Sequence, residues 1–215
     1  MTMTGDIIPI PLPDEQLILH RFAIKPHHLD RYLPLWRREV EVRRRHGFTT
    51  HRAFLETNAE PKLTWLYSHA DPDAGNQAVL DDPETAELDA LKAPHVFRNV
   101  KIRPVRGEYL SHLDASADAH PLAVMRRYSI VGSWDEFLGI WRRILQVREK
   151  YGFGALFAVA DEPENMFTWA FEFDGEWADF PAAQHDYYHD DDRVALRGVF
   201  DFMADYTINP ATQLL

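Results

Sequence analysis

The stretch WRREVEVRRRHGF at residues 36–48 decides the fold, because it recurs 105 residues later as WRRILQVREKYGF at residues 141–153. Seven of the thirteen positions are identical. In both copies apolar residues recur every three or four positions, which predicts an amphipathic helix. Each copy ends in Gly-Phe, a pattern typical of a helix that stops in a Schellman motif. The repeat indicates that the chain contains two copies of one structural unit.

The similarity continues on both sides of the repeated phrase. Upstream, LHRFAIKPHHLDRYLPLW resembles MRRYSIVGSWDEFLGIW, and downstream, KLTWLYSHADPD resembles MFTWAFEFDGEW. Alternating β-branched and aromatic residues predict strands on either side of each helix. We expect strands at 17–24, 48–56, 63–69 and 97–104 in the first copy and at 122–131, 154–160, 166–173 and 203–208 in the second, first helices at 28–46 and 134–151, and second helical regions at 80–92 and 180–203.

Each copy therefore has the order strand, helix, strand, strand, helix, strand of the ferredoxin-like unit. Such a sheet has helices on one face only, so a second copy can cover the other face. The predicted fold class is α+β, with two tandem ferredoxin-like units forming an intrachain pair like a dimeric α/β barrel. The predicted domains are an N-terminal extension at 1–16, a first repeat at 17–105, a linker at 106–121 and a second repeat at 122–215.

Two local signals refine the first helix of each copy. Ser133 and Glu136 form a capping-box pattern at the start of the second copy's helix. Pro34 and Gly139 occupy the same repeat position, and both residue types weaken a helix interior. We therefore expect a bend or a close backbone approach at that position in both copies.

The composition excludes several classes of site and partner. The chain has 215 residues and no cysteine, which excludes a disulfide scaffold and a thiolate zinc site. Net charge is −11, and residues 106–215 carry −10 of it, with nine Lys or Arg and 19 Asp or Glu. This balance disfavours a nucleic-acid partner or an anionic membrane surface. The start of the chain lacks a basic signal-peptide region and no apolar run is long enough to span a membrane, so we expect a cytoplasmic protein.

Both copies are similar to NIPSNAP domains, which belong to the dimeric α/β-barrel superfamily. The resemblance lies in the first strand, the tryptophan helix ending in His-Gly-Phe or Tyr-Gly-Phe, and the segments LDDPE at 80–84 and HDDDRVAL at 189–196. It covers about residues 17–105 and 122–210. The second copy has Asp190-Asp191-Asp192 in place of the usual Asp-Pro-Glu. The resemblance implies a superfamily that includes cofactor-free monooxygenases, small-molecule isomerases and cyclases, and haem enzymes.

A comparison of the two copies identifies candidate site residues. Trp65, Tyr67 and His69 alternate along one strand, so their side chains share a face. Histidine suits proton transfer near neutral pH, and tyrosine can donate a hydrogen bond to a developing oxyanion. Exposure of these polar groups on an open strand is the alternative interpretation. The first copy has the polar residues His51, Arg52, Tyr67 and His69 at the positions where the second copy has the apolar residues Leu156, Phe157, Phe171 and Phe173, in that order.

We therefore predict catalytic roles for His51, Tyr67 and His69. Trp65, His20 and Arg52 are predicted to bind substrate around them.

A second candidate segment is QHDYYH at residues 184–189. Tyr187 and Tyr188 are predicted to pack or to line a substrate pocket. His185 and His189 lie four positions apart, which is compatible with a metal on one helix face. The segment lacks a third ligand, so no metal is the first prediction and this histidine pair is the alternative.

The function predicted from the sequence is that of a small-molecule-binding pocket protein. Its chemistry would be that of an organic-cofactor-free oxygenase, cyclase or isomerase acting on an apolar or aromatic metabolite. Two alternatives are a non-enzymatic interaction protein of NIPSNAP type and a haem-binding enzyme. No cofactor is predicted, with haem as the alternative because eleven histidines supply many possible proximal ligands. A homodimer is also possible.

Overall fold

The computed structural model describes residues 13–57, 60–97, 100–111 and 122–215. Most of the predicted N-terminal extension, residues 1–12, and most of the predicted linker, residues 112–121, lie outside these ranges. The chain forms two compact units. The first unit consists of Pro13–Arg106 together with Ala211–Leu215, and the second contains Gly107–Pro210.

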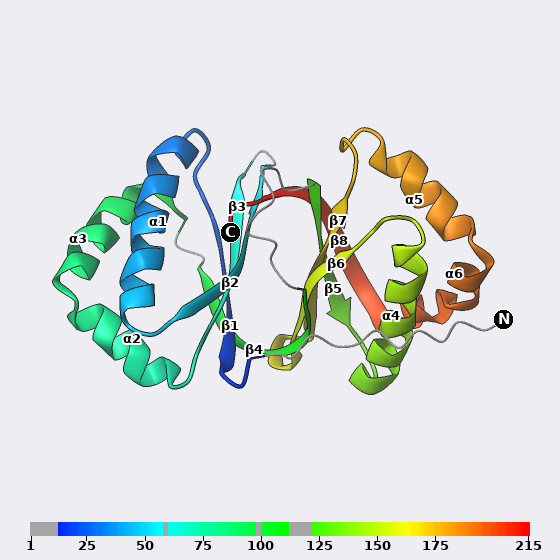
Figure 1. Cartoon of the computed structure of the whole chain (residues 1–215), viewed down its shortest axis with the longest axis horizontal. Coiled ribbons are helices and arrows are strands. Elements are labelled where there is room, and N and C mark those ends of the chain that lie inside the picture. The colour runs from blue at the N-terminus through cyan, green and yellow to red at the C-terminus, as the bar shows by residue number, and fades with distance from the viewer. Residues whose placement is uncertain (1–12, 58–59, 98–99, 112–121) are drawn as a thin grey trace. The chain divides into compact units, whose positions relative to one another are not determined.

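The first unit is a sheet covered on one face by helices α1, α2 and α3 (Figure 1). Strand β1 pairs antiparallel with β3 and with β4, and β3 pairs antiparallel with β2. Residues 211–213 of β8 pair with the end of β2. The elements are β1 (Gln16–Ala23), α1 (Leu29–Arg45), β2 (Thr49–Glu56), β3 (Lys62–His69), α2 (Pro72–Asp81), α3 (Pro83–Lys92), a 3-10 turn (Ala93–His95) and β4 (Lys101–Leu110).

The second unit repeats this plan, with helices α4, α5 and α6 beside strands β5, β6 and β7 (Figure 1). Strand β7 pairs antiparallel with both β5 and β6. The elements are β5 (Leu122–Ile130), α4 (Trp134–Glu149), β6 (Ala155–Asp161), a 3-10 turn (Glu162–Glu164), β7 (Met166–Phe173), α5 (Phe180–His189), α6 (Asp191–Ala195), a 3-10 segment (Arg197–Phe202) and β8 (Met203–Gln213).

The predicted order of elements is confirmed in both units, so the fold class is α+β with tandem ferredoxin-like units. Strand β4 differs most from the prediction, because it begins at Lys101 and continues to Leu110. Residues 106–110, predicted as linker, therefore belong to a strand. Pro104 is a poor strand former, and the pairing of β4 with β1, in which Pro104 is the partner of Ile18, overrides its propensity. The second helical region of the first copy also begins earlier than predicted, at Pro72.

The two long helices end as the repeated Gly-Phe pattern predicts. Gly47 has a φ of +86°, and its N–H donates to the Arg44 carbonyl at 3.1 Å. The Phe48 N–H donates to the Arg43 carbonyl at 3.1 Å, which completes the Schellman motif. The same pair of bonds, at 3.2 and 3.1 Å, ends α4 at Gly152 and Phe153. At the start of α4, Ser133 Oγ accepts the Glu136 N–H at 3.3 Å, as predicted.

The prediction of a close backbone approach at Gly139 is wrong. A Cβ atom built on Gly139 would meet no described atom within 4 Å, so this glycine faces open space. Pro34, its counterpart, lies inside α1 as expected.

The same tryptophan contact holds the helix to the sheet in each unit. The rings of Trp36 and Trp65 lie edge to face with centroids 5.8 Å apart, and those of Trp141 and Trp169 with centroids 5.7 Å apart. All four rings are buried, and edge-to-face pairs add specificity to the area that they remove from water. The repeated phrase thus provides the anchor between α1 or α4 and its sheet.

Candidate functional site

The helix-covered face of the first unit carries the predicted aromatic wall. Trp65 and Tyr67 lie on this face of β3, with ring centroids 4.6 Å apart, and Trp65 contacts Trp36 of α1. Both side chains are buried, so the alternative of solvent exposure does not hold for them. Burial raises the pKa of Tyr67 to about 12, so its hydroxyl stays protonated and can donate a hydrogen bond at neutral pH.

His20 of β1 joins this wall. Its ring stacks on Trp65 at 5.8 Å and lies 6.3 Å from Tyr67. Its Nδ1 atom is buried and has no hydrogen-bond partner among the residues that the structure describes. Burial lowers the pKa of His20 to about 4, so the imidazole is neutral at pH 7 and has one unpartnered ring nitrogen.

A charged cluster from α1 and α3 faces the same wall. Glu39 Oε1 accepts from Arg43 Nε at 3.3 Å, and Glu39 Oε2 accepts from Lys92 Nζ at 2.8 Å. The Arg43 guanidinium lies over the Tyr67 ring at 5.2 Å. Burial alone would raise the pKa of Glu39, but Lys92 and Arg43 outweigh it and lower that pKa. The cluster therefore holds the Glu39 carboxylate between two cations, and Asp89 pairs with Lys92 at 3.0 Å, so its positive and negative charges balance.

A cavity of about 220 Å³, which we call the helix-side cavity, opens beside this cluster. Ile102 of β4 is one of its walls, and Ile102 is the register partner of His20 on β1. His20, Trp65 and Tyr67 are not among the lining residues, so the cavity is connected to the aromatic wall through Arg43, which lines the cavity and lies over the Tyr67 ring. Its lining is Glu39, Val42, Arg43, Asn76, Val79, Leu80, Thr85, Leu88, Asp89, Lys92 and Ile102.

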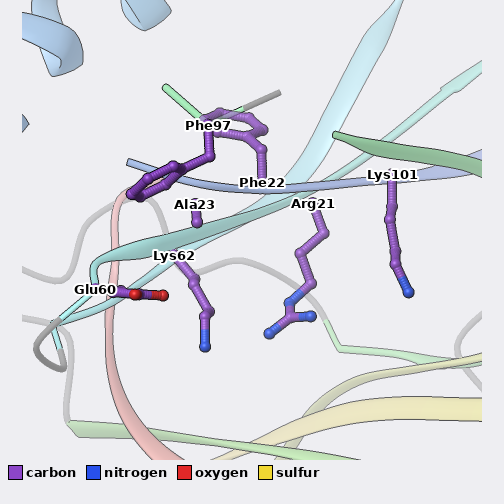
Figure 2. A pocket seen from close by; sticks show the side chains of 7 residues that line it. All are labelled: Arg21, Phe22, Ala23, Glu60, Lys62, Phe97 and Lys101. Carbon is purple, nitrogen blue, oxygen red and sulfur yellow. The ribbon is translucent and has the colours of Figure 1, made fainter. Parts of the chain in front are cut away.

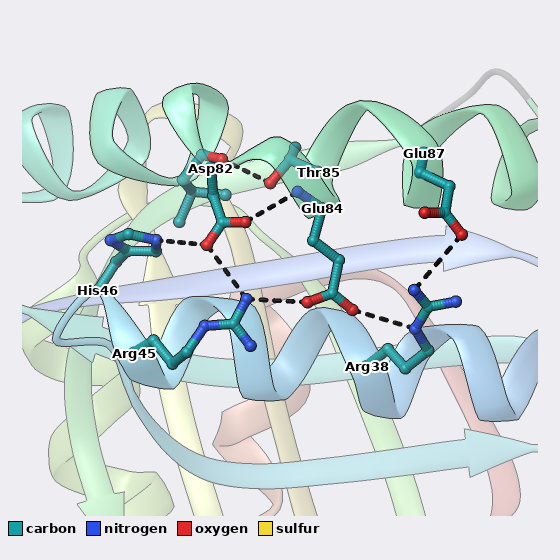
Figure 3. Close-up of polar contacts among 8 residues, drawn as sticks. Arg38, Arg45, His46, Asp82, Glu84, Thr85 and Glu87 are labelled. Atoms are coloured by element: carbon teal, nitrogen blue, oxygen red, sulfur yellow. Dashed lines mark hydrogen bonds and ion pairs between the residues drawn. The ribbon is translucent and has the colours of Figure 1, made fainter.

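A network of ion pairs fixes the helices that frame this cavity (Figure 3). The Asp82 carboxylate accepts from His46 Nε2 at 2.9 Å and from Arg45 at 3.1 Å. It also accepts the Glu84 N–H at 2.9 Å, which caps the start of α3. The hydrogen bonds from His46, the Glu84 N–H and Arg45 lower the pKa of Asp82 to about 2. Arg38 of α1 bonds Glu84 at 3.1 Å, so α1 is joined to α3 at two points.

The structure does not bring His51 to the aromatic wall. The register between β2 and β3 shifts between Thr50 and Arg52, which makes His51 an extra residue at a β-bulge. Its Nε2 lies 2.8 Å from Ser68 Oγ, and Ser68 is on the opposite face of β3 from Tyr67. The Ser68 hydroxyl donates to Glu15 at 2.5 Å, so it is not available as a nucleophile activated by His51.

Arg52 and His69 also lie apart from the cavity. Arg52 pairs in register with Leu66 and is buried on the opposite face, where its Nη1 donates to the His51 carbonyl at 2.8 Å. His69 shares the face of Tyr67, but its Nε2 donates to the His46 carbonyl at 3.1 Å. Its Nδ1 accepts the Asp71 N–H at 2.9 Å, so both ring nitrogens hold the backbone.

The tyrosines predicted to bind substrate lie in the second unit. Tyr187 is buried against Phe153, with ring centroids 6.0 Å apart, and Tyr188 contacts Arg126 at 3.5 Å. His185 and His189 stack on an exposed face of α5 with centroids 4.1 Å apart. Across the described ranges no three His, Cys, Asp or Glu side chains are grouped so as to hold a metal ion.

Sequence reasoning missed Glu39, Arg43 and Lys92. Arginine and glutamate on a helix flank are normally solvated, so the sequence pattern favoured a surface role for them. A signal was present in the repeat, because the second copy has Ile144 at the position of Glu39. An acid that is replaced by isoleucine in its own repeat indicates a buried position.

A second pocket in the first unit, of about 350 Å³, is, like the helix-side cavity, lined by none of the predicted site residues (Figure 2). Arg21, Lys62 and Lys101 extend in one direction from their strands. Lys101 and Glu60 are exposed, so water screens their charges. We therefore regard the helix-side cavity, with its buried charges, as the better candidate. The pocket of about 350 Å³ is lined by Arg21, Phe22, Ala23, Glu60, Lys62, Phe97 and Lys101.

No protein-family model and no curated protein matches the chain. Several solved structures are similar to the chain. A proposed monooxygenase from Fusobacterium nucleatum is similar over 94% of each chain, with 12% identity and a TM-score of 0.64. An anthrone oxidase-like protein is similar over 96% of this chain and 94% of its own, with 9% identity and a TM-score of 0.60. A haem-binding protein from Thermus thermophilus is similar over 97% and 95%, with 12% identity and a TM-score of 0.52.

These similarities show the fold, which is that of dimeric α/β-barrel proteins. A NIPSNAP domain protein from Burkholderia xenovorans matches 44% of this chain with a TM-score of 0.36, which does not establish the predicted NIPSNAP family. Within the part of the chain that the structure describes, no helix is long and apolar enough to cross a membrane.

Proposed function

We propose that this protein binds a small, mostly apolar molecule in the helix-side cavity and oxidises it with molecular oxygen, without an organic cofactor. One observation carries the proposal: a buried, neutral imidazole shares the aromatic wall with a charged cluster of one carboxylate and two cations, and that cluster lines a cavity. Perturbed titratable groups beside a cavity are typical of functional sites. The monooxygenase and anthrone oxidase names of two proteins with this fold support an oxygenase role.

The cavity lining restricts the ligand. Val79, Leu88 and Ile102 offer apolar contact, while Arg43 and Lys92 offer positive charge. A volume of about 220 Å³ lies below the roughly 300–1,000 Å³ of pockets for drug-sized ligands. The ligand that fits best is therefore a molecule of one or two rings that carries an acidic hydroxyl, or a carbonyl next to an acidic C–H group.

His20 would accept the proton, and the two cations would stabilise the negative charge that proton removal leaves on the ligand. Neutral His20 accepts the proton from the bound C–H or O–H group. Arg43 and Lys92 stabilise the resulting oxyanion, and protonated Tyr67 is a further hydrogen-bond donor on the same wall. The carbanion or phenolate then gives its electrons to oxygen. For a methylene next to a carbonyl, one O₂ converts CH₂ to C=O and releases one water, so that atoms and electrons balance.

Single substitutions test this assignment. His20→Phe and Tyr67→Phe should lower oxygen consumption with 2-tetralone and 2-naphthol by about 10²-fold or more if these groups act on the proton and the oxyanion. His51→Leu and His69→Phe, which introduce the residues of the second copy, are the matched controls and should keep near-normal rates. Equal rates in all four variants, or no turnover by the wild-type protein, would exclude the cavity as an oxygenase site.

Two alternatives to an oxygenase can be tested as well: a non-enzymatic interaction protein and a haem-binding enzyme. A non-enzymatic interaction protein requires an exposed apolar surface, and the exposed Leu80 and Ile102 at the cavity would contribute to it. In that case no small molecule would bind in the cavity, and calorimetry with 2-naphthol would give no heat.

Light scattering in the same buffers tests the predicted homodimer.

The residues of the helix-side cavity do not fit haem. No histidine lines this cavity, and Phe22 and Trp65 pack against the ring of His20 at 5.0 and 5.8 Å. Neither this cavity of about 220 Å³ nor the pocket of about 350 Å³ has the enclosed volume that a porphyrin needs. A Soret band after haem addition, lost in His20→Phe, would reverse this conclusion.

A further inference from the structure

The second unit contains three arginines whose guanidinium groups converge in its interior. They come from different elements: Arg126 from β5, Arg148 from α4 and Arg193 from α6. Their side chains border one small pocket, which we call the arginine pocket. The three residues are 3%, 2% and 4% exposed, so each cation is almost completely removed from water.

No carboxylate neutralises these cations within the described part of the chain. The Nε atoms of all three, and Nη1 of Arg148, are buried without a hydrogen-bond partner. Arg126 Nη2 reaches only the Tyr188 hydroxyl, at 3.5 Å. Arg148 lies over the Tyr187 ring at 4.4 Å, and such contacts offset part of the cost of burying a cation. These hydrogen-bond donors have no partner among the described residues of the unit.

The repeat shows what the arginine pocket lacks. Arg148 corresponds to Arg43 of the first copy, where Glu39 lies one turn earlier and pairs with it at 3.3 Å. The second copy has Ile144 at that position, so the internal carboxylate is absent. It also has Arg126 in place of His20. Relative to the first unit, the second has lost one acid and gained one permanent cation at the same place in the fold.

We propose that the arginine pocket binds a small planar oxyanion, a carboxylate in particular, which takes the place that Glu39 fills in the first unit. The free volume is about 20 Å³, enough for a group of water or carboxylate size and too small for a ring. Guanidinium groups donate strong charge-assisted hydrogen bonds to carboxylates, and Nε and Nη1 of Arg148 are two donors without a partner among the described residues. This site is separate from the helix-side cavity and goes beyond the proposed function.

Two further features support an anion at this position. Phe200 and Tyr206 border the pocket and are 47% and 55% exposed, so an anion can enter past their rings. Burial alone would raise the pKa of Tyr188, but Arg126, Arg148 and Arg193 together lower it. A lowered pKa of a buried phenol indicates a positive electrostatic potential around it, and the same potential would attract an anionic ligand.

The test is a titration of the full chain with sodium formate, nitrate, benzoate and chloride at constant ionic strength, followed by calorimetry and thermal unfolding. Formate and nitrate should bind saturably and raise Tm, because a ligand that binds only the folded state stabilises it. If benzoate binds more tightly than formate, the preferred ligand is an aromatic acid whose ring lies at Phe200 and Tyr206. Chloride as tight as formate would overturn the assignment to planar oxyanions.

Three variants locate the site. Arg148→Met removes the central cation, and Ile144→Glu restores the internal carboxylate of the first copy one turn before Arg148. Each should weaken formate binding by about tenfold or more. Arg143→Met, at an exposed arginine of the same helix, is the control and should bind formate like the wild type.

Ile144→Glu separates the proposal from a purely structural role of the arginines. If an anion is needed in the pocket, this variant should melt at or above the Tm of the anion-free wild type, because the introduced carboxylate supplies that anion internally. A lower Tm together with unchanged formate binding would overturn the proposal. So would a wild-type protein that shows no saturable binding of formate or nitrate, since the aromatic rings alone would then accommodate the cations.

Discussion

Individual buried charges are handled in three different ways in this chain. His20 becomes neutral, because burial lowers its pKa to about 4. Glu39 remains charged between Arg43 and Lys92, whose positive charges more than compensate for its burial. Arg148 keeps its charge and has only aromatic faces around it. A guanidinium cannot readily lose its proton, so the third case is the one that requires a ligand.

At the residue scale, His20→Phe should reduce the acid sensitivity of the protein. Between pH 6.5 and 4 the unfolded chain binds a proton at His20 and the folded chain does not, so stability falls as pH drops through this window. At about 1.36 kcal/mol per pKa unit, the loss is at most about 3 kcal/mol. Phenylalanine has no such proton, so the stability of this variant should fall less between pH 7 and pH 4.

Urea unfolding at pH 7, 6, 5 and 4 measures this difference. His185→Phe, at an exposed histidine, is the control and should follow the wild-type pH profile. Parallel pH profiles for wild type and His20→Phe would mean that His20 is not held neutral in the folded protein.

At the scale of single elements, replacement by alanine should have opposite effects at the glycine inside α4 and at the glycines that follow the ends of α1 and α4. Gly139→Ala should stabilise by about 0.5–1 kcal/mol, because it lies in a helix interior and its Cβ meets open space. Gly152→Ala should cost about 1–2 kcal/mol, since its φ is +72°. Gly47→Ala should cost more, because its Cβ would also lie 3.0 Å from His69 Nε2.

Chemical denaturation of the three variants ranks them directly. The order Gly139→Ala, wild type, Gly152→Ala, Gly47→Ala from most to least stable is the expected outcome. A Gly47→Ala variant as stable as Gly152→Ala would show that the His69 ring moves aside without cost.

The elements themselves were largely predictable, because internal repetition supplied two independent versions of each pattern. The aromatic wall of Trp65 and Tyr67 followed from alternation along one strand. The place of His51 did not, since one extra residue at a β-bulge moves a side chain to the other face without any clear sequence signal. Glu39 and Arg43 were missed because burial of charges on a helix depends on what packs over them, which periodicity does not show.

At the scale of the whole molecule, the two compact units do not correspond to two contiguous segments of chain. Residues 211–215 were predicted as part of the second repeat, but they pack with the first unit. The Ala53 N–H donates to the Leu215 carbonyl at 3.1 Å, and the Leu214 N–H donates to the Ala53 carbonyl at 2.8 Å. Gln213 pairs in register with Phe54. The sheet of the first unit is therefore incomplete without the last residues of this sequence.

Removal of residues 211–215 should destabilise the first unit by about 2–4 kcal/mol, from several lost hydrogen bonds at about 0.5–1.5 kcal/mol each. Hydrogen exchange followed by mass spectrometry should show faster exchange in β2. Exchange in β7 of the second unit should stay close to that of the full chain. Unchanged protection of β2 would contradict the pairing with β8.

The same pairing has a consequence for translation. The ribosome makes residues 13–106 before the second repeat, and the strand that pairs with Phe54–Glu56 follows only after roughly 100 more residues. At about 5–20 residues per second, this edge of β2 stays uncovered for several seconds. An apolar, unpaired strand edge is a site of aggregation and of chaperone binding. The unit that emerges first is thus the one that is completed last, and the nascent chain carries an open edge until then.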